Sequence, residues 1–114
     1  MIGIIGAMRI EVETIKSLME IEETKTISGV EYVSGKLHGK EIVVAVCGIG
    51  KVAAAMCTQT MILTYSPECI INTGVGGSLS NKLNICDIAI SLKALFSTIW
   101  TPRLSATLLV LFRA

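Results

Sequence analysis

Residues 41–64 read EIVVAVCGIGKVAAAMCTQTMILT and join three structural signals in one stretch. The first apolar run does not alternate with polar residues, as a strand buried on both faces requires. Gly48 and Gly50 mark the end of that run. The Ala- and Met-rich segment after them predicts a well-buried helix over residues 51–64, which Ser66-Pro67 ends. A strand, a glycine turn and a helix in this order indicate an α/β domain.

The same pattern continues on both sides of this stretch. Residues 30–37 alternate between apolar and polar types, which favours an exposed or edge strand. The charged residues 22–25 are interpreted as a connector. Strands that alternate with helices predict a largely parallel or mixed sheet. The predicted strands are residues 2–6, 30–37, 41–47, 69–73 and 87–91, and the predicted helices are residues 9–20 and 51–64.

Composition restricts the function classes. The 114 residues suffice for one small domain, and 52% hydrophobic against 17% charged residues excludes a disordered chain. The net charge of +1 gives no reason to expect a nucleic-acid partner. The apolar runs are shorter than the roughly 20 residues of a membrane helix. No basic segment precedes the first strand, so we expect no signal peptide, no membrane partner and a soluble cytoplasmic protein.

The sulfur-containing residues are predicted to be structural. The four cysteines have no C-x-x-C spacing and lie in or beside apolar runs, which favours small buried side chains in a reducing cytosol over disulfides or a metal site. Met8, Met56 and Met61 are interpreted as core residues.

Glu11 is the first candidate for chemistry. It follows a strand that ends in Gly6-Ala7 and is expected in the first helical turn, near the carboxyl edge of the sheet, where open α/β sheets bind ligands. A carboxylate at this place can act as a general acid or base, or hold a water molecule. The plain alternative is that it only complements the helix dipole.

Two glycine-rich segments are the other candidates. Residues 48–50 precede a helix, and residues 74–78 follow a central strand that ends in Asn72-Thr73. Glycines let a backbone approach a ligand closely. The first segment matches neither a Walker A loop nor G-x-G-x-x-G, because the required residues are missing. Ordinary structural turns remain the alternative for both.

Together these segments resemble the 5′-methylthioadenosine/S-adenosylhomocysteine nucleosidases. The stretch Ile2-Gly-Ile-Ile-Gly-Ala-Met8, with a glutamate at position 11, resembles the opening of that family. Gly48-Ile-Gly-Lys-Val-Ala-Ala-Ala55 resembles its second motif, and Ile70-Ile-Asn-Thr-Gly74 with the two glycines that follow resembles its third. Asp87-Ile-Ala-Ile-Ser91 is similar to its next strand, so the resemblance extends from residue 1 to about residue 91.

The resemblance implies an α/β fold: the N-terminal half of a nucleoside-phosphorylase-like α/β/α sandwich with a mixed, mainly parallel sheet. It implies hydrolysis of the N-glycosidic bond of methylthioadenosine and S-adenosylhomocysteine, with release of adenine. Glu11 matches the family glutamate that helps to hold and activate water. No metal or organic cofactor is implied, and family members are homodimers. The implied substrate-binding residues are Ala7, Met8, Val75, Gly76 and Gly77.

The sequence departs from the family pattern in two kinds of place. Val75 stands where the family often has a serine hydroxyl, and Arg9 and Ile10 stand where it usually has acidic residues. The family's later segments, with the glutamate that grips ribose hydroxyls and the aspartate that protonates adenine, have no counterpart in these 114 residues. We therefore expect the 114-residue polypeptide to be inactive. We also expect Val43, Val44, Ile70 and Ile71 to be exposed and to favour aggregation.

The last stretch, residues 92–114, has no strand–turn–helix rhythm and is interpreted as an aberrant tail after a partial nucleosidase domain at residues 1–91. Ile99-Trp-Thr-Pro102 can be encoded as ATA TGG ACN CCN, and an offset reading then allows His-Asp-Met-Asp-Ala-Thr-Ala-Phe-Gly-Tyr, which is close to the family's continuation. A frameshift, real or from sequencing, is the hypothesis for this tail.

Two alternatives stay open at this stage. One is another superfamily member, such as a purine nucleoside phosphorylase or a futalosine hydrolase. The other is a non-catalytic remnant. The DNA of the locus would discriminate the remnant from a sequencing error, through a reading frame restored after about Leu95.

Overall fold

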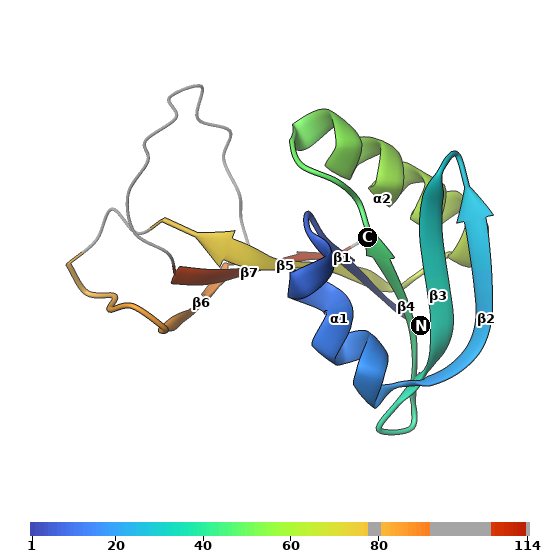
Figure 1. Ribbon diagram of the computed structural model, residues 1–114, viewed down its shortest axis with the longest axis horizontal. Helices are drawn as coiled ribbons and strands as arrows, with labels where there is room; N and C mark the ends of the chain where they lie inside the picture. The colour runs from blue at the N-terminus through green and yellow to red at the C-terminus, as the bar shows by residue number, and fades with distance from the viewer. Residues whose placement is uncertain (78–80, 92–105, 114) are drawn as a thin grey trace.

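The computed structural model describes residues 1–77, 81–91 and 106–113. Within these residues the chain forms one seven-stranded sheet, in the order β2-β3-β4-β1-β5-β7-β6, and two helices that lie on opposite sides of it (Figure 1). The elements are β1 (Ile2–Gly6), α1 (Arg9–Leu18), β2 (Glu20–Ile27), β3 (Val30–Leu37), β4 (Lys40–Val46), α2 (Lys51–Tyr65), β5 (Cys69–Gly76), β6 (Ile88–Ser91) and β7 (Ala106–Arg113).

The sheet is mixed, with a parallel centre. Strand β1 pairs in parallel with both β4 and β5, and β6 pairs in parallel with β7. The pairs β2–β3, β3–β4 and β5–β7 are antiparallel. The α/β class and the mixed sheet predicted from the sequence are therefore confirmed.

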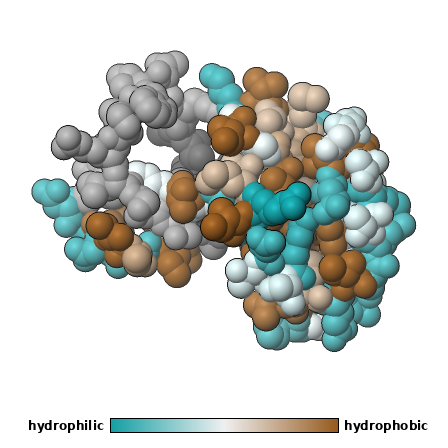
Figure 2. Space-filling model, in the orientation of Figure 1, coloured by the Kyte–Doolittle hydropathy of each residue, from teal (hydrophilic) through white to brown (hydrophobic). Residues whose placement is uncertain are grey.

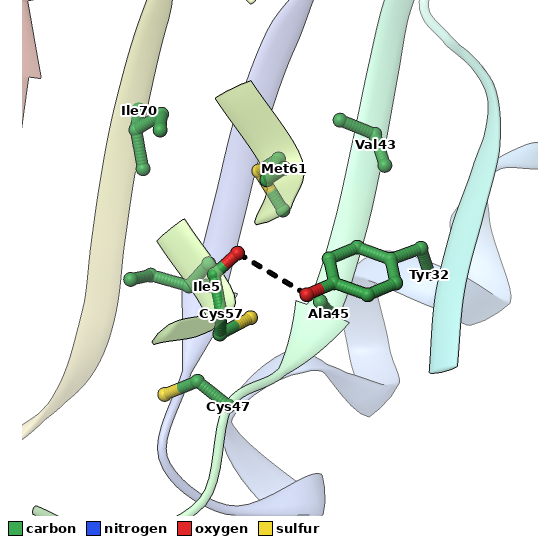
Figure 3. Close-up of a cluster of buried hydrophobic side chains, with 8 residues drawn as sticks. All are labelled: Ile5, Tyr32, Val43, Ala45, Cys47, Cys57, Met61 and Ile70. Carbon is green, nitrogen blue, oxygen red and sulfur yellow. Dashed lines mark hydrogen bonds between the residues drawn. The ribbon is translucent and has the colours of Figure 1, made fainter. Parts of the chain in front are cut away.

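The core lies on both faces of the central strands. Neighbouring residues of a strand point to opposite faces, so β1 supplies Ile5 to the cluster under α2 and Ile4 to the cluster under α1. Helix α2 adds Cys57 and Met61 to the first cluster, where the Tyr32 hydroxyl donates a hydrogen bond of 3.2 Å to the Cys57 carbonyl oxygen (Figure 3). This two-sided burial explains why the central strands are apolar throughout.

Two tight hairpins build the edge of the sheet beside β4. Ser28 and Gly29 connect β2 to β3, and His38 and Gly39 connect β3 to β4. All four have positive φ angles, between 49° and 78°, as the hairpin turns that match strand twist require.

The predicted strands and helices are confirmed to within a few residues, but two interpretations at this edge are wrong. The charged residues 22–25 are not a connector, because they lie within β2. Strand β3 is not an edge strand, because β2 covers its outer side and its residues 32–35 are buried. Strand β2 is exposed on nearly its whole length, and its charges are typical of an edge strand protected against pairing with other chains.

Strands β5 and β7 differ from the sequence prediction too. Strand β5 continues through Gly76, so residues 74–76 are strand rather than loop. Residues 106–113 form β7, between β5 and β6, although we predicted no strand in this stretch. The continuous apolar run of residues 108–112 is what an internal strand requires.

The expected exposure of the central strands is wrong for Val43 and Val44, which are completely buried, and for Ile70, which is nearly so. Ile71 is half-buried. Two groups of exposed apolar residues lie elsewhere, on α2 and at β6, where Figure 2 shows hydrophobic surface. The group at β6 consists of Ile85, just before the strand, and Ile88 and Ile90 within it. Among the described residues, neither helix has the length and apolarity needed to cross a membrane.

The predictions for the sulfur-containing residues are partly wrong. Cys47, Cys57 and Met61 are buried as predicted. Met8 and Met56 are exposed, as is one of the cysteines, Cys86. All four cysteines are free thiols.

Candidate functional site

The carboxyl ends of three parallel strands meet at one edge of the sheet. Gly6, the last residue of β1, lies opposite Val46 of β4 on one side and Thr73 of β5 on the other. The backbone N–H of Cys47 donates a 2.8 Å hydrogen bond to the Gly6 carbonyl, which ties the exits of β4 and β1 together. Glu11 and the two glycine-rich segments, which follow these strands, therefore lie at the same edge of the sheet.

Glu11 is the side chain that links two of these segments. It occupies the first turn of α1, and its Oε2 accepts a 2.8 Å hydrogen bond from the backbone N–H of Met8, just before the helix. Its Oε1 accepts a 3.2 Å hydrogen bond from the backbone N–H of Val75 in β5. The first contact is the helix-end role that the plain alternative predicts. The second contact joins α1 to a residue of β5 that is 64 positions away in the sequence. Helix capping alone does not explain this contact.

The residues around this carboxylate leave it accessible from one side. Ala7 and Gly76 are half-buried, Met8 and Gly77 are exposed, and the Val75 side chain is 61% exposed while its N–H points to Glu11. Glu11 itself is half-buried. The sheet edge therefore presents a carboxylate, held by two hydrogen bonds, beside the glycine-rich end of β5.

A glycine-rich turn borders the site on the β4 side. Gly48 and Gly50 have φ angles of +85° and +103°, which glycine adopts readily and other residues rarely do. Gly50 lies directly before α2, and Ile49 between the two glycines is highly exposed. The turn therefore has a structural requirement for glycine, as its plain interpretation predicts.

Arg9, one of the departures from the family pattern, lies in a surface groove of about 240 Å³ that Lys16, Glu31 and Val46 also line. The pKa of Glu31 is lowered, chiefly by its hydrogen bond to Lys16 and also by the charge of Arg9. The charge of Arg9 is thus partly balanced by Glu31 of β3.

Cys47 is the buried ionisable group at this edge. Burial raises the pKa of its thiol, and the nearby Cys57 and Glu11 contribute in the same direction. Its Sγ donates a hydrogen bond of 3.3 Å to the Gly48 carbonyl. A thiol with a raised pKa is a poor nucleophile, so Cys47 is a packing residue rather than a reactive one.

Sequence reasoning placed Glu11 correctly but did not identify its partners. These partners are the backbone N–H groups of Met8 and Val75. A pattern of side-chain types does not indicate which backbone N–H groups act as donors. The glycines that flank Val75 were the available signal, because they indicated a close approach to the backbone at that point.

Comparison with known proteins gives the family. The sequence model of the phosphorylase superfamily matches residues 1–105. The 5′-methylthioadenosine/S-adenosylhomocysteine nucleosidase of Shewanella sediminis is 49% identical over 90 residues, which are 79% of this chain and 39% of that protein. The chain therefore spans well under half the length of the curated relatives that it matches.

Solved structures agree in fold. The methylthioadenosine/S-adenosylhomocysteine nucleosidase of Colwellia psychrerythraea 34H, in complex with adenine, matches with a TM-score of 0.73 and 33% identity, over 79% of this chain and 38% of that one. The futalosine hydrolase of Helicobacter pylori strain 26695 matches with a TM-score of 0.67 and 40% identity, over 74% and 36% of the two chains. Since the superfamily model covers residues 1–105 and these structures match with TM-scores of 0.73 and 0.67, the chain belongs to the phosphorylase superfamily.

Proposed function

We propose that this chain supplies the water-activating half of an enzyme that hydrolyses the N-glycosidic bond of 5′-methylthioadenosine and S-adenosylhomocysteine, with release of adenine. The observation that carries the proposal is the Glu11 carboxylate, held at the carboxyl edge of the sheet by the N–H groups of Met8 and Val75. The relatives named as nucleosidases for these two substrates support the choice of reaction.

The proposed chemistry uses the acceptor capacity that Glu11 retains. An ionised carboxylate has about four acceptor positions, and the two backbone N–H groups occupy one on each oxygen. The remaining positions can hold a water molecule against the anomeric carbon of a bound nucleoside. As the bond to adenine breaks, the sugar gains positive charge, the water oxygen bonds to the anomeric carbon and Glu11 accepts the proton of that water as general base. The departing adenine takes its proton from an acid that the other half of the enzyme would supply. The proposed reaction requires neither a metal nor an organic cofactor.

The same geometry supports the substrate-binding roles proposed for Ala7, Met8, Val75, Gly76 and Gly77. These residues flank Glu11 on the exits of β1 and β5. Close to a sugar ring, a backbone with small side chains allows van der Waals contact without steric conflict. We propose that this segment lies along the ribose.

We also propose a homodimer that forms through α2. Val52, Met56 and Leu63 are each more than 60% exposed and follow one another at helical spacing along the side of α2 that faces away from the sheet. A helix that is apolar on two opposite sides is typical of an element covered on both. Helix α2 begins directly after the glycine turn that borders the candidate site. A second copy that covers the apolar stripe of α2 would therefore lie next to that site.

The four free thiols agree with a reducing compartment, which supports the cytoplasm as the location. The division of the chain at residue 91 also stays a proposal, with a frameshifted tail at residues 92–114. It rests on the reading-frame argument alone, because the superfamily model continues to residue 105 and residues 106–113 form β7. Sequencing of the locus tests it.

A second candidate is hydrolysis of futalosine, because the futalosine hydrolase of Helicobacter pylori is 40% identical to this chain over the matched region. Both reactions break an N-glycosidic bond to a purine, so the role proposed for Glu11 is the same in each. The substrate assay therefore includes futalosine as a competitor of methylthioadenosine.

The decisive experiment is a chimera in which residues 1–91 of this chain replace the corresponding segment of the Shewanella sediminis relative. We expect the chimera to release adenine from methylthioadenosine, and the 114-residue chain alone to release none. Glu11→Gln should lower kcat by about 10²–10⁴-fold, the usual contribution of general acid–base catalysis. Glu13→Gln is the matched control, because Glu13 is exposed on the same helix away from the site and should leave the rate unchanged. A chimera in which Glu11→Gln retains full activity would contradict the proposal.

A further inference from the structure

Gly74 lies against the carboxylate of Glu11. A Cβ atom added at Gly74 would stand 2.9 Å from Oε1 and 3.3 Å from Cδ of Glu11. In real structures a Cβ atom essentially never comes within 3.0 Å of a heavy atom outside its own residue and its two chain neighbours. The backbone at Gly74 does not have a positive φ angle, so the requirement for glycine here is one of space and not of conformation.

We propose that Gly74 is a positioning residue, which keeps the Glu11 carboxylate in the place where the Val75 N–H binds it. The inference rests on the proposed function of Glu11 and deepens it. Because glycine has no Cβ atom, the space that a methyl group would fill at position 74 of β5 is free for the Glu11 carboxylate. Any side chain at position 74 would push Oε1 away from the Val75 N–H, 3.2 Å from it at present.

The effect of such a substitution should fall on Glu11 rather than on the core. Oε1 is the end of a flexible side chain, so it can move at little cost to the fold. Gly3 of β1 provides the contrast, because a Cβ there would stand 2.5 Å from Sδ of Met61, which is completely buried. Gly6 is a less selective choice, since its added Cβ would also meet the buried Val12 at 2.7 Å.

The test measures backbone amide hydrogen exchange by NMR in the 114-residue chain. Gly74→Ala should speed exchange of the Val75 N–H by about tenfold, as expected when a hydrogen bond to a charged group is lost. Glu11→Ala should speed exchange at both Met8 and Val75. Gly3→Ala should lower the urea midpoint and leave exchange at Val75, relative to other β5 amides, unchanged. Unaltered exchange at Val75 in a folded Gly74→Ala protein would overturn the proposal.

A double-mutant cycle keeps the proposal testable even if Gly74→Ala folds poorly. In a Glu11→Ala background the conflict is absent, so the loss of stability caused by Gly74→Ala should largely disappear. An equal loss in both backgrounds would refute the positioning role. In the chimera, Gly74→Ala should lower kcat by about 100-fold, as small misplacements of catalytic groups do, with little change in KM. The exchange and stability results do not depend on activity, so failure of the proposed function would be recognised separately.

Discussion

The two helices cover opposite faces of one sheet and differ in what they present outward. Helix α1 buries Val12 and turns mainly polar residues to the outside, with Ile10 and Leu18 as exposed exceptions. Helix α2 buries Cys57 and Met61, and its opposite side is apolar as well. The outward stripe of α2 consists of Val52, Met56, Gln59 and Leu63, at positions i, i+4, i+7 and i+11.

This difference is what the proposed homodimer requires, because only α2 would lie between the two copies. The outer side of α1 carries mainly polar residues. At its border with the sheet, Lys16 forms a 2.9 Å salt bridge to Glu31 of β3. The outer side of α2 exposes three large apolar residues, Val52, Met56 and Leu63, and a group of this kind is what the proposed contact between copies would cover. Both helices begin at the edge that holds Glu11, so α1 contributes the carboxylate and α2 contributes the proposed contact between copies.

The largest effect on the free energy of unfolding should come from a substitution on the inner side of α2. Met61→Ala removes a completely buried side chain from the cluster with Ile5 and Val43, and should lower the free energy of unfolding by about 2–5 kcal/mol. Val12→Ala, the matched change under α1, removes less volume and should cost about 1–3 kcal/mol. Urea denaturation measures both. A larger loss for Val12→Ala would reverse the comparison between the two helices.

The outer sides of the helices provide a second contrast. Leu63 on α2 and Leu18 on α1 are similarly exposed, at 75% and 65%. Leu63→Ala should weaken a homodimer about tenfold, since truncating a central interface residue commonly costs more than 1 kcal/mol. Leu18→Ala should leave the dimer unchanged. Sedimentation equilibrium of the chimera measures the dissociation constants, and equal effects of the two substitutions would remove α2 from the interface.

Much of this arrangement could be predicted from the sequence. The central strands are apolar on both faces, so their runs identified β1, β4 and β5 directly. Strand β2 could not be recognised, because an edge strand exposed on both faces has no apolar periodicity and is held by the Ser28-Gly29 turn and by pairing with β3. Overlooking β2 also made β3 appear to be the edge.

The site was predictable in position but not in its contacts. Parallel strands bring their carboxyl ends together, so the meeting of Glu11 with the end of β5 followed from the strand directions. The sequence could not indicate that Val75 contributes its N–H and not its side chain, or that Gly74 lies against Oε1. Such contacts depend on differences of a few tenths of an ångström in the distance between atoms. The spacing of residue types along the sequence does not determine differences of that size.

The smallest predicted effect at neutral pH concerns the hydrogen bond that links α2 to β3. Tyr32 is 1% exposed, and its hydroxyl donates to the Cys57 carbonyl. Tyr32→Phe keeps the ring and should cost about 0.5–1.5 kcal/mol at neutral pH, the usual net value of one hydrogen bond. Thermal or urea unfolding measures this loss.

The same residue predicts a pH dependence whose sign follows from its pKa. Burial, followed by the hydrogen bond to Cys57, raises the pKa of Tyr32 from 10.0 to about 12. The folded state therefore holds the phenol proton more tightly than the unfolded state does. This contribution to stability is complete below pH 10 and is lost as the pH rises toward 12.

Burial also raises the pKa of the Cys57 thiol, so some alkaline loss of stability should remain in a protein without the phenol. Tyr32→Phe should consequently flatten the fall in unfolding free energy between pH 10 and 12, while Phe in place of the half-buried Tyr65 should flatten it less. An alkaline slope that is identical in Tyr32→Phe and in the unsubstituted chain would show that the phenol is not buried between α2 and the sheet.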